Sequence, residues 1–171
     1  SPSGIGNPPT VYESYDDLVA SRTAYIEDMA LKVGAQEYQL TDLDGDGKQE
    51  LIYKEGGWTG VFTMKNGQVK QLASGRDVKL CEGNILAVTR SYLDGNKTYC
   101  YYKIENGNAV LVDYLRYDVD RDPENPWFRS PDLTGQDMTL KPISEMEAKS
   151  IIASYDPLEM DRKPIAEYPF Q

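Results

Sequence analysis

Short turn sequences divide the middle of the chain and point to an antiparallel β-structure. Lys65-Asn66-Gly67-Gln68 and Glu105-Asn106-Gly107-Asn108 contain Asn-Gly, Leu93-Asp94-Gly95-Asn96 contains Asp-Gly, and Glu82-Gly83-Asn84 is a fourth turn of similar composition. Such residues tolerate positive φ and select the type I′ turn that joins two antiparallel strands. Strands are therefore expected at roughly 37–41, 50–54, 58–65, 68–73, 77–81, 85–92, 97–105 and 108–117, in consecutive hairpins without a βαβ crossover.

A helix is predicted on each side of this β region. Ser14 comes shortly before two acidic residues and a series of apolar residues at spacings of three and four, which is typical of an N-cap and an amphipathic helix. Gly34 is the expected end of this helix. Ser144-Glu145-Met146-Glu147 is a capping box, and the apolar positions of the helix that follows share one face: Ala148, Ile151, Ile152 and Tyr155.

The segment between the first two predicted strands carries carboxylates at alternate positions. Counting from Asp42, acidic side chains stand at positions 1, 3, 5 and 9, and Gly47 at position 6 allows the sharp turn. Ca²⁺ takes about six to eight oxygen ligands, and this spacing lets them converge on one ion. The expected ligands are the side chains of Asp42, Asp44, Asp46 and Glu50 and the backbone carbonyl of Lys48. The alternative is a solvated acidic turn that binds no ion.

This loop differs from an EF-hand, because its position 12 is Tyr53 in place of a bidentate Glu and its flanks have the pattern of strands. It resembles the Asp-rich calcium loops of the FG-GAP and VCBS repeat families of extracellular proteins. The longer segment Tyr38–Ile52 resembles more closely a group of secreted bacterial lipoproteins that have no established activity. The run Pro142–Glu147 is similar to the closing helix of that group. The resemblance implies an architecture and an extracellular location, but no chemistry.

These elements predict one α+β domain. The length of 171 residues suits a single domain with a buried core. Residues 1–13 are expected to form a flexible linker, because Pro, Gly and Ser are frequent among them. Residues 14–171 would form an antiparallel β-meander flanked by an N-terminal and a C-terminal helix, with the calcium loop between the first two strands.

The composition excludes several classes of function. Acidic residues outnumber basic ones 28 to 18, and the net charge of −10 argues against nucleic acid or an anionic membrane as a partner. The chain contains no histidine, which removes Ser-His-Asp and Cys-His nucleophiles and most zinc sites. No apolar run approaches the roughly 20 residues that a transmembrane helix needs.

A secreted or cell-surface protein is expected, because extracellular calcium suits a weak loop of this kind. The chain does not begin with Met, so an upstream signal or lipid anchor is expected to have been removed. The protein is expected to be a monomer. Cys81 and Cys100 could bridge in such a setting, but they are predicted on different strands and out of step, which favours two free thiols.

The segment 118–135 has no regular pattern and is a candidate functional loop. Asp118, Asp120 and Asp122 repeat the alternate spacing of the calcium loop, but Pro123 and Pro126 stand where the glycine and the last ligand belong. A solvated strand end is therefore preferred over a second metal site.

Aromatic residues give the main candidates for a partner surface. If Glu105 pairs with Asn108, one face of the hairpin carries Tyr99, Tyr101, Val112 and Tyr114. Aromatic side chains beside acidic and amide groups can bind a sugar or a protein. Trp127 and Phe128 could serve the same purpose or close the loop onto the core. Trp58, which has glycines on both sides, is expected in the core.

No residue pattern identifies a catalytic centre. The expected function is therefore a non-catalytic, calcium-stabilised module that binds a protein or a glycan through the tyrosine face or the loop 118–135. A small glycoside hydrolase that uses two carboxylates is the first alternative. A purely structural spacer domain is the second.

Overall fold

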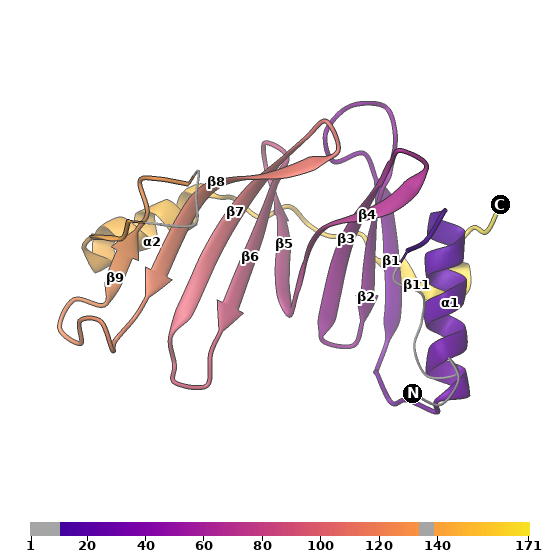
Figure 1. Cartoon of the computed structure of the whole chain (residues 1–171), viewed down its shortest axis with the longest axis horizontal. Coiled ribbons are helices and arrows are strands. Elements are labelled where there is room, and N and C mark those ends of the chain that lie inside the picture. The colour runs from indigo at the N-terminus through magenta and orange to yellow at the C-terminus, as the bar shows by residue number, and fades with distance from the viewer. Residues whose placement is uncertain (1–10, 134–138) are drawn as a thin grey trace.

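The computed structural model of the chain describes residues 11–133 and 139–171. Within them, two antiparallel β-sheets lie between two helices, and Figure 1 shows the helices at opposite ends of the molecule with the sheets between them. The α+β class is as predicted. The prediction of a single antiparallel meander is wrong in one respect, because the strands divide into two sheets.

The first sheet follows the helix α1 (Tyr15–Asp28) and has the order β11-β1-β2-β3-β4. Its strands are β1 (Gln36–Thr41), β2 (Glu50–Glu55), β3 (Trp58–Lys65), β4 (Gln68–Gly75) and the short β11 (Lys163–Pro164). The second sheet has the order β10-β9-β8-β7-β6-β5. Its strands are β5 (Asp77–Cys81), β6 (Ile85–Ser91), β7 (Lys97–Glu105), β8 (Asn108–Tyr117), β9 (Trp127–Arg129) and β10 (Lys141–Pro142). The helix α2 (Glu145–Ser154) and the 3-10 helix η1 (Ile165–Glu167) complete the fold.

The eight predicted strands are present, with ends within two residues of those expected. The turns explain this accuracy, because Asn66 and Asn106 have φ of 52° and 50°, the backbone conformation that Asn-Gly accepts easily. The segment 118–135, expected to be irregular, contains β9, which pairs with β8 through Tyr117↔Trp127.

The alternation of side chains along the strands builds three hydrophobic layers. Ile52 and Val61 of the first sheet pack against Leu86, Val88 and Ile104 of the second, so this layer joins the two sheets. The opposite face of the first sheet is covered by α1, where Leu18 and Val19 contact the cluster formed by Tyr38, Leu51 and Tyr53. On the far face of the second sheet, Ala148 of α2 packs with Tyr101, Leu115 and Trp127.

Both helices begin where predicted. The hydroxyl of Ser14 accepts a hydrogen bond from the backbone N–H of Asp17 at 3.1 Å, and that of Ser144 accepts one from Glu147 at 3.0 Å. The end of α1 was predicted wrongly, because the helix stops at Asp28 and not at Gly34.

A Schellman motif built on alanine ends α1. Ala30 has φ of 49°, its N–H bonds the carbonyl of Glu27 at 3.1 Å, and the N–H of Leu31 bonds the carbonyl of Ile26 at 3.0 Å. Glycine is the usual residue at such a position, so the sequence carries no sign of this ending.

The C-terminal segment connects the two ends of the molecule. After α2 the backbone N–H of Leu158 bonds the carbonyl of Leu80 at 2.8 Å, and Tyr38 then pairs with Lys163 of β11. The hydroxyl of Tyr168 donates to Asp16 at the start of α1 at 2.8 Å. Figure 1 shows this segment in yellow as it passes from α2 towards α1.

Candidate metal centre

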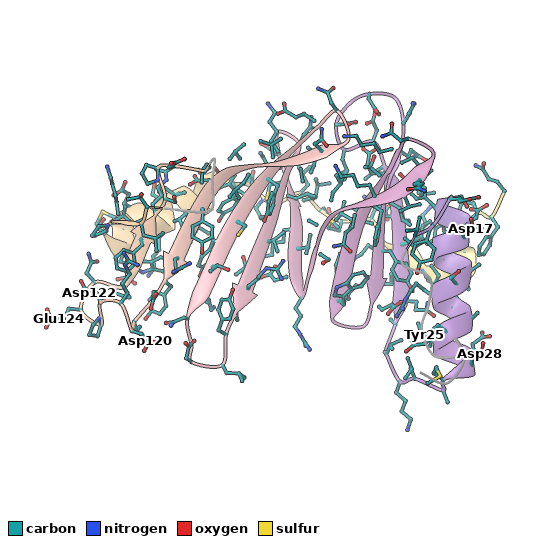
Figure 2. All side chains as sticks on the ribbon, viewed as in Figure 1. Asp17, Tyr25, Asp28, Asp120, Asp122 and Glu124 are labelled. Carbon is teal, nitrogen blue, oxygen red and sulfur yellow. The ribbon has the colours of Figure 1, made fainter. Side chains whose placement is uncertain are left out.

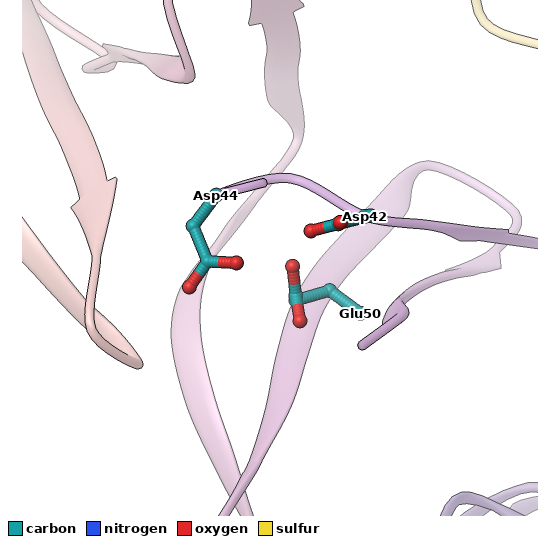
Figure 3. A group of neighbouring side chains, drawn as sticks. All are labelled: Asp42, Asp44 and Glu50. Atoms are coloured by element: carbon teal, nitrogen blue, oxygen red, sulfur yellow. The ribbon is translucent and has the colours of Figure 1, made fainter. Parts of the chain in front are cut away.

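The loop between β1 and β2 brings three of the predicted ligands together. One carboxylate oxygen each of Asp42, Asp44 and Glu50 lies within 4.8 Å of the other two (Figure 3). This is the one group of three such residues with close ligand atoms in the described parts of the chain. All the donors are anionic oxygens, which are the ligands that Ca²⁺ prefers.

Backbone hydrogen bonds hold the loop in its curved form. The two oxygens of Asp42 accept from the N–H groups of Gly45 and Gly47, each at 2.8 Å. Gly45 and Gly47 have φ of 75° and 85°, while a Cβ at either position would meet nothing within 4 Å. Glycine is therefore favoured here by backbone conformation and not by lack of space. These hydrogen bonds, that from Gly47 above all, lower the pKa of Asp42.

Glu50 is the buried member of the group. Its residue is 1% exposed, and its Oε1 accepts a hydrogen bond from the backbone N–H of Leu43 at 2.7 Å. Burial, followed by the negative charges of Asp44, Asp46 and Asp42, raises the pKa of Glu50 to about 7. A divalent cation at the centre would reverse both effects, because it would supply the opposite charge that the buried carboxylate needs.

The loop lies where the two sheets meet. In Figure 1 the β1–β2 loop stands at the top of the molecule beside the turn between β7 and β8. The pKa of Asp44 is raised by burial first, while a backbone hydrogen bond from Gly107 of that turn opposes the increase. Lys65 and Lys70 bind the same turn, since their ammonium groups donate to the amide oxygen of Asn108 at 2.7 Å and 2.8 Å.

The other two predicted ligands are placed differently. Asp46 is exposed and lies outside the close group, and its Oδ1 accepts a hydrogen bond from the backbone N–H of Lys48 at 2.8 Å. Lys48, whose backbone carbonyl was the fifth predicted ligand, is also exposed. The arrangement thus provides three side chains, one buried and two nearer the surface.

The second run of aspartates has its own local partners. Asp118 accepts a hydrogen bond from the backbone N–H of Arg121 at 3.1 Å, and Asp120 accepts one from the amide of Asn96 at 2.9 Å. Asp122 accepts from the N–H of Glu124 at 3.1 Å. Figure 2 shows Asp120, Asp122 and Glu124 spread along the outside of the loop before β9. These contacts fit the solvated strand end that the sequence favoured.

The predicted tyrosine face does not form one surface. Glu105 pairs with Asn108 as expected, but the register shifts between Tyr101 and Tyr102. Tyr101 therefore pairs with Asp113, and Tyr114 pairs with Cys100 on the opposite face of the sheet. The bulge explains why counting from the turn placed Tyr114 on the wrong side.

The aromatic residues that were predicted to contact a partner are largely covered by other parts of the protein. Tyr101 stacks on Tyr155, the C-cap residue of α2, with ring centroids 3.8 Å apart, and Trp127 packs edge-on against Tyr117. Tyr101, Tyr114, Trp127 and Phe128 are all buried, and Tyr99 is half-buried. The alternative, in which Trp127 and Phe128 close their segment onto the core, describes the structure correctly.

The two cysteines are free thiols, as the sequence favoured. Cys81 on β5 is buried and Cys100 on β7 is partly buried, with β6 between their strands. Burial raises the pKa of both thiols.

A pocket that the sequence reasoning missed lies beside α1, on the outer face of the first sheet. Its volume is about 440 Å³, and aromatic residues from β2, β3 and the segment before α1 line it: Tyr12, Tyr53, Trp58 and Phe62. Trp58, expected in the core, is half-buried and lines this pocket. The glycines around Trp58 were the available signal, because Gly60 leaves room for its ring.

Comparisons with protein-family models, with curated proteins and with solved structures found no match to this chain. No helix in the described segments has both the length and the apolar character to cross a membrane. The functional conclusions below are therefore drawn from the geometry of the loop and the pocket.

Proposed function

We propose that the protein is a non-catalytic, calcium-stabilised binding module of the extracellular space or the cell surface, acting as a monomer. The observation that carries this proposal is the convergence of Asp42, Asp44 and Glu50 at the junction of the two sheets. An ion bound there neutralises the acidic loop and adds its binding free energy to folding.

The location follows from the kind of site. Three carboxylates on a loop that is partly open to solvent suit a weak site, which calcium at the millimolar level outside cells would fill.

The binding role is supported by the pocket beside α1, which combines aromatic walls with a small number of polar groups. Pockets of this composition and size are typical of small-molecule sites in proteins. The ligand would be a glycan or a segment of a protein partner.

Thermal unfolding with calcium and with a chelator tests the calcium site. At a free calcium concentration 100 times the dissociation constant, the expected gain in the free energy of unfolding is about 2.7 kcal/mol. The Asp44→Asn variant is expected to lose this gain. Asp120→Asn, from the other acidic run, is the matched control and is expected to keep it. Equal melting temperatures of the unmutated protein in calcium and in chelator would overturn the proposal.

A further inference from the structure

The pocket beside α1 has a rigid polar floor. Arg22 of α1 donates from Nε and Nη2 to the two oxygens of Glu55 at 2.6 Å and 2.8 Å. The hydroxyl of Tyr53 donates to the same carboxylate at 2.8 Å, and the amide of Gln36 donates to that hydroxyl at 2.8 Å. Each side chain in this series of hydrogen bonds is held by its neighbour, so the floor needs little reordering when a ligand binds.

The floor retains hydrogen-bonding capacity. The guanidinium of Arg22 has more N–H donors than the two used by Glu55, and a carboxylate accepts more than the bonds it already holds. Gln71 of β4, which is exposed, also lines the pocket; its amide nitrogen donates to Ser74 at 3.2 Å, which leaves its amide oxygen as an acceptor. Donors and acceptors therefore face the same space.

The charges that line the pocket cancel. Arg22 and Glu55 are its charged residues, and they form a two-point ion pair. Because the two charges of this pair offset each other, the pocket offers no net attraction that would compensate a charged ligand for the loss of its hydration. The ligand that fits is neutral, with both apolar and hydroxyl surfaces.

Gly60 determines how Trp58 lies in the pocket. A Cβ on Gly60 would come within 2.6 Å of the Trp58 ring and 2.7 Å of the Phe62 ring. Because glycine has no Cβ, both rings lie close against the strand, with their centroids 6.4 Å apart. Trp58 therefore forms a wall that its two aromatic neighbours hold in place, rather than a freely rotating surface side chain.

We infer that this pocket binds a neutral sugar ring of a glycan, with Trp58 against the apolar C–H face of the ring and the Arg22–Glu55 pair and Gln71 on its hydroxyl groups. This inference rests on the proposed function as a binding module and names its ligand class. Sugar rings present both kinds of surface at once, and the large flat face of Trp suits the apolar one.

The experiment uses the two tryptophans of the chain as reporters. In a Trp127→Phe variant of the full chain, Trp58 is the one remaining tryptophan. Neutral cello-, xylo-, manno- and chito-oligosaccharides are titrated while tryptophan emission is recorded, and at least one is expected to give a saturable change. The Trp58→Phe variant is the matched control, and its buried Trp127 is expected to give none.

Two variants then connect binding to the pocket. Their affinities are measured by isothermal titration calorimetry, because Trp58→Ala removes the fluorescent reporter. Trp58→Ala is expected to weaken binding about tenfold, and replacing the exposed Gln71 by alanine, which leaves the core intact, about threefold to tenfold. Tyr92→Ala, at an exposed turn of the second sheet, is expected to bind as the unmutated protein does.

The outcomes separate the two proposals. If no neutral oligosaccharide changes the emission of Trp58, the pocket inference is wrong. If glycan binding survives both Trp58→Ala and Gln71→Ala, the site lies elsewhere and the inference is again wrong, while the binding module stands. The calcium-dependent melting temperature of the same Trp127→Phe sample tests the calcium-stabilised module independently.

Discussion

The carboxylate of Glu50 and the backbone N–H of Leu43 are joined by a hydrogen bond of 2.7 Å that closes the base of the β1–β2 loop. Leu43 is buried in the layer between the sheets, so this bond ties the acidic loop to the central core. Occupancy of the loop and packing of the core are therefore expected to change together, which is the physical basis of the proposed stabilisation by calcium.

Glu50→Gln is expected to have opposite effects with and without calcium. The glutamine oxygen can still accept from Leu43, while above about pH 7 the change removes a buried charge from beside Asp42 and Asp44. In chelator the free energy of unfolding of the variant should equal that of the unmutated protein or exceed it by up to about 1 kcal/mol. In calcium it should be the less stable protein, because a charged ligand is missing. Urea unfolding in both solutions measures this, with exposed Glu105→Gln as the control. If the unmutated protein were the more stable of the two in both solutions, or the less stable in both, the prediction would be contradicted.

Ala30→Gly is expected to stabilise the protein. Ala30 holds φ of 49° at the end of α1, a conformation that costs an L-residue about 1 kcal/mol and glycine very little. Ala24→Gly, at an exposed position within the same helix, should instead destabilise by about 1 kcal/mol. Chemical denaturation of both variants gives the two signs, and a loss of stability in Ala30→Gly would refute the assignment of the Schellman motif.

Local signals explain which parts of the fold were predictable. The strand ends depend on Asn-Gly turns and the helix starts on Ser14 and Ser144, all of which act within a few residues. The convergence of Asp42, Asp44 and Glu50 was predictable for the same reason, since their spacing is a property of one loop.

Longer-range packing explains what was missed. The bulge at Tyr101 and Tyr102 leaves no mark in the alternation of the strand, yet it moves Tyr114 to the other face. The pocket requires Arg22 of α1 to meet Glu55 at the end of β2, 33 positions away in the chain. The division into two sheets between Gly75 and Asp77 is likewise set by tertiary packing.

Tyr155→Phe is expected to destabilise the fold by about 1.5 kcal/mol. The hydroxyl of Tyr155 donates at 2.9 Å to Asp113, which is 4% exposed and also accepts from Arg129 at 2.9 Å and 3.0 Å. The phenylalanine ring keeps the stack on Tyr101, so the change isolates the loss of a hydrogen bond to a buried carboxylate. Tyr92→Phe, at an exposed position, is the control in urea unfolding. Equal stability of the two variants would show that Asp113 does not depend on Tyr155.

The stability of the protein is expected to fall at alkaline pH because of its buried tyrosines. Burial raises the pKa of Tyr53 and Tyr101, and burial together with the hydrogen bond to Asp113 raises that of Tyr155 to about 12. An unfolded tyrosine loses its proton near pH 10, so above this pH the folded state binds more protons than the unfolded state. The stabilising contribution is therefore complete below about pH 10 and is lost as the pH rises through the folded pKa values.

Urea unfolding at successive pH values, with phenolate absorbance recorded on the folded protein, measures this effect. The free energy of unfolding should decline from about pH 10 upwards, while Tyr53, Tyr101 and Tyr155 ionise later in the folded protein than in the urea-unfolded chain. Tyr155→Phe should reduce the steepness of the decline, and Tyr92→Phe should leave it closer to that of the unmutated protein. If all tyrosines of the folded protein titrated together near pH 10 with no loss of stability, the rings of Tyr53 and Tyr101 would not be buried, nor that of Tyr155 partly buried, as the structure places them.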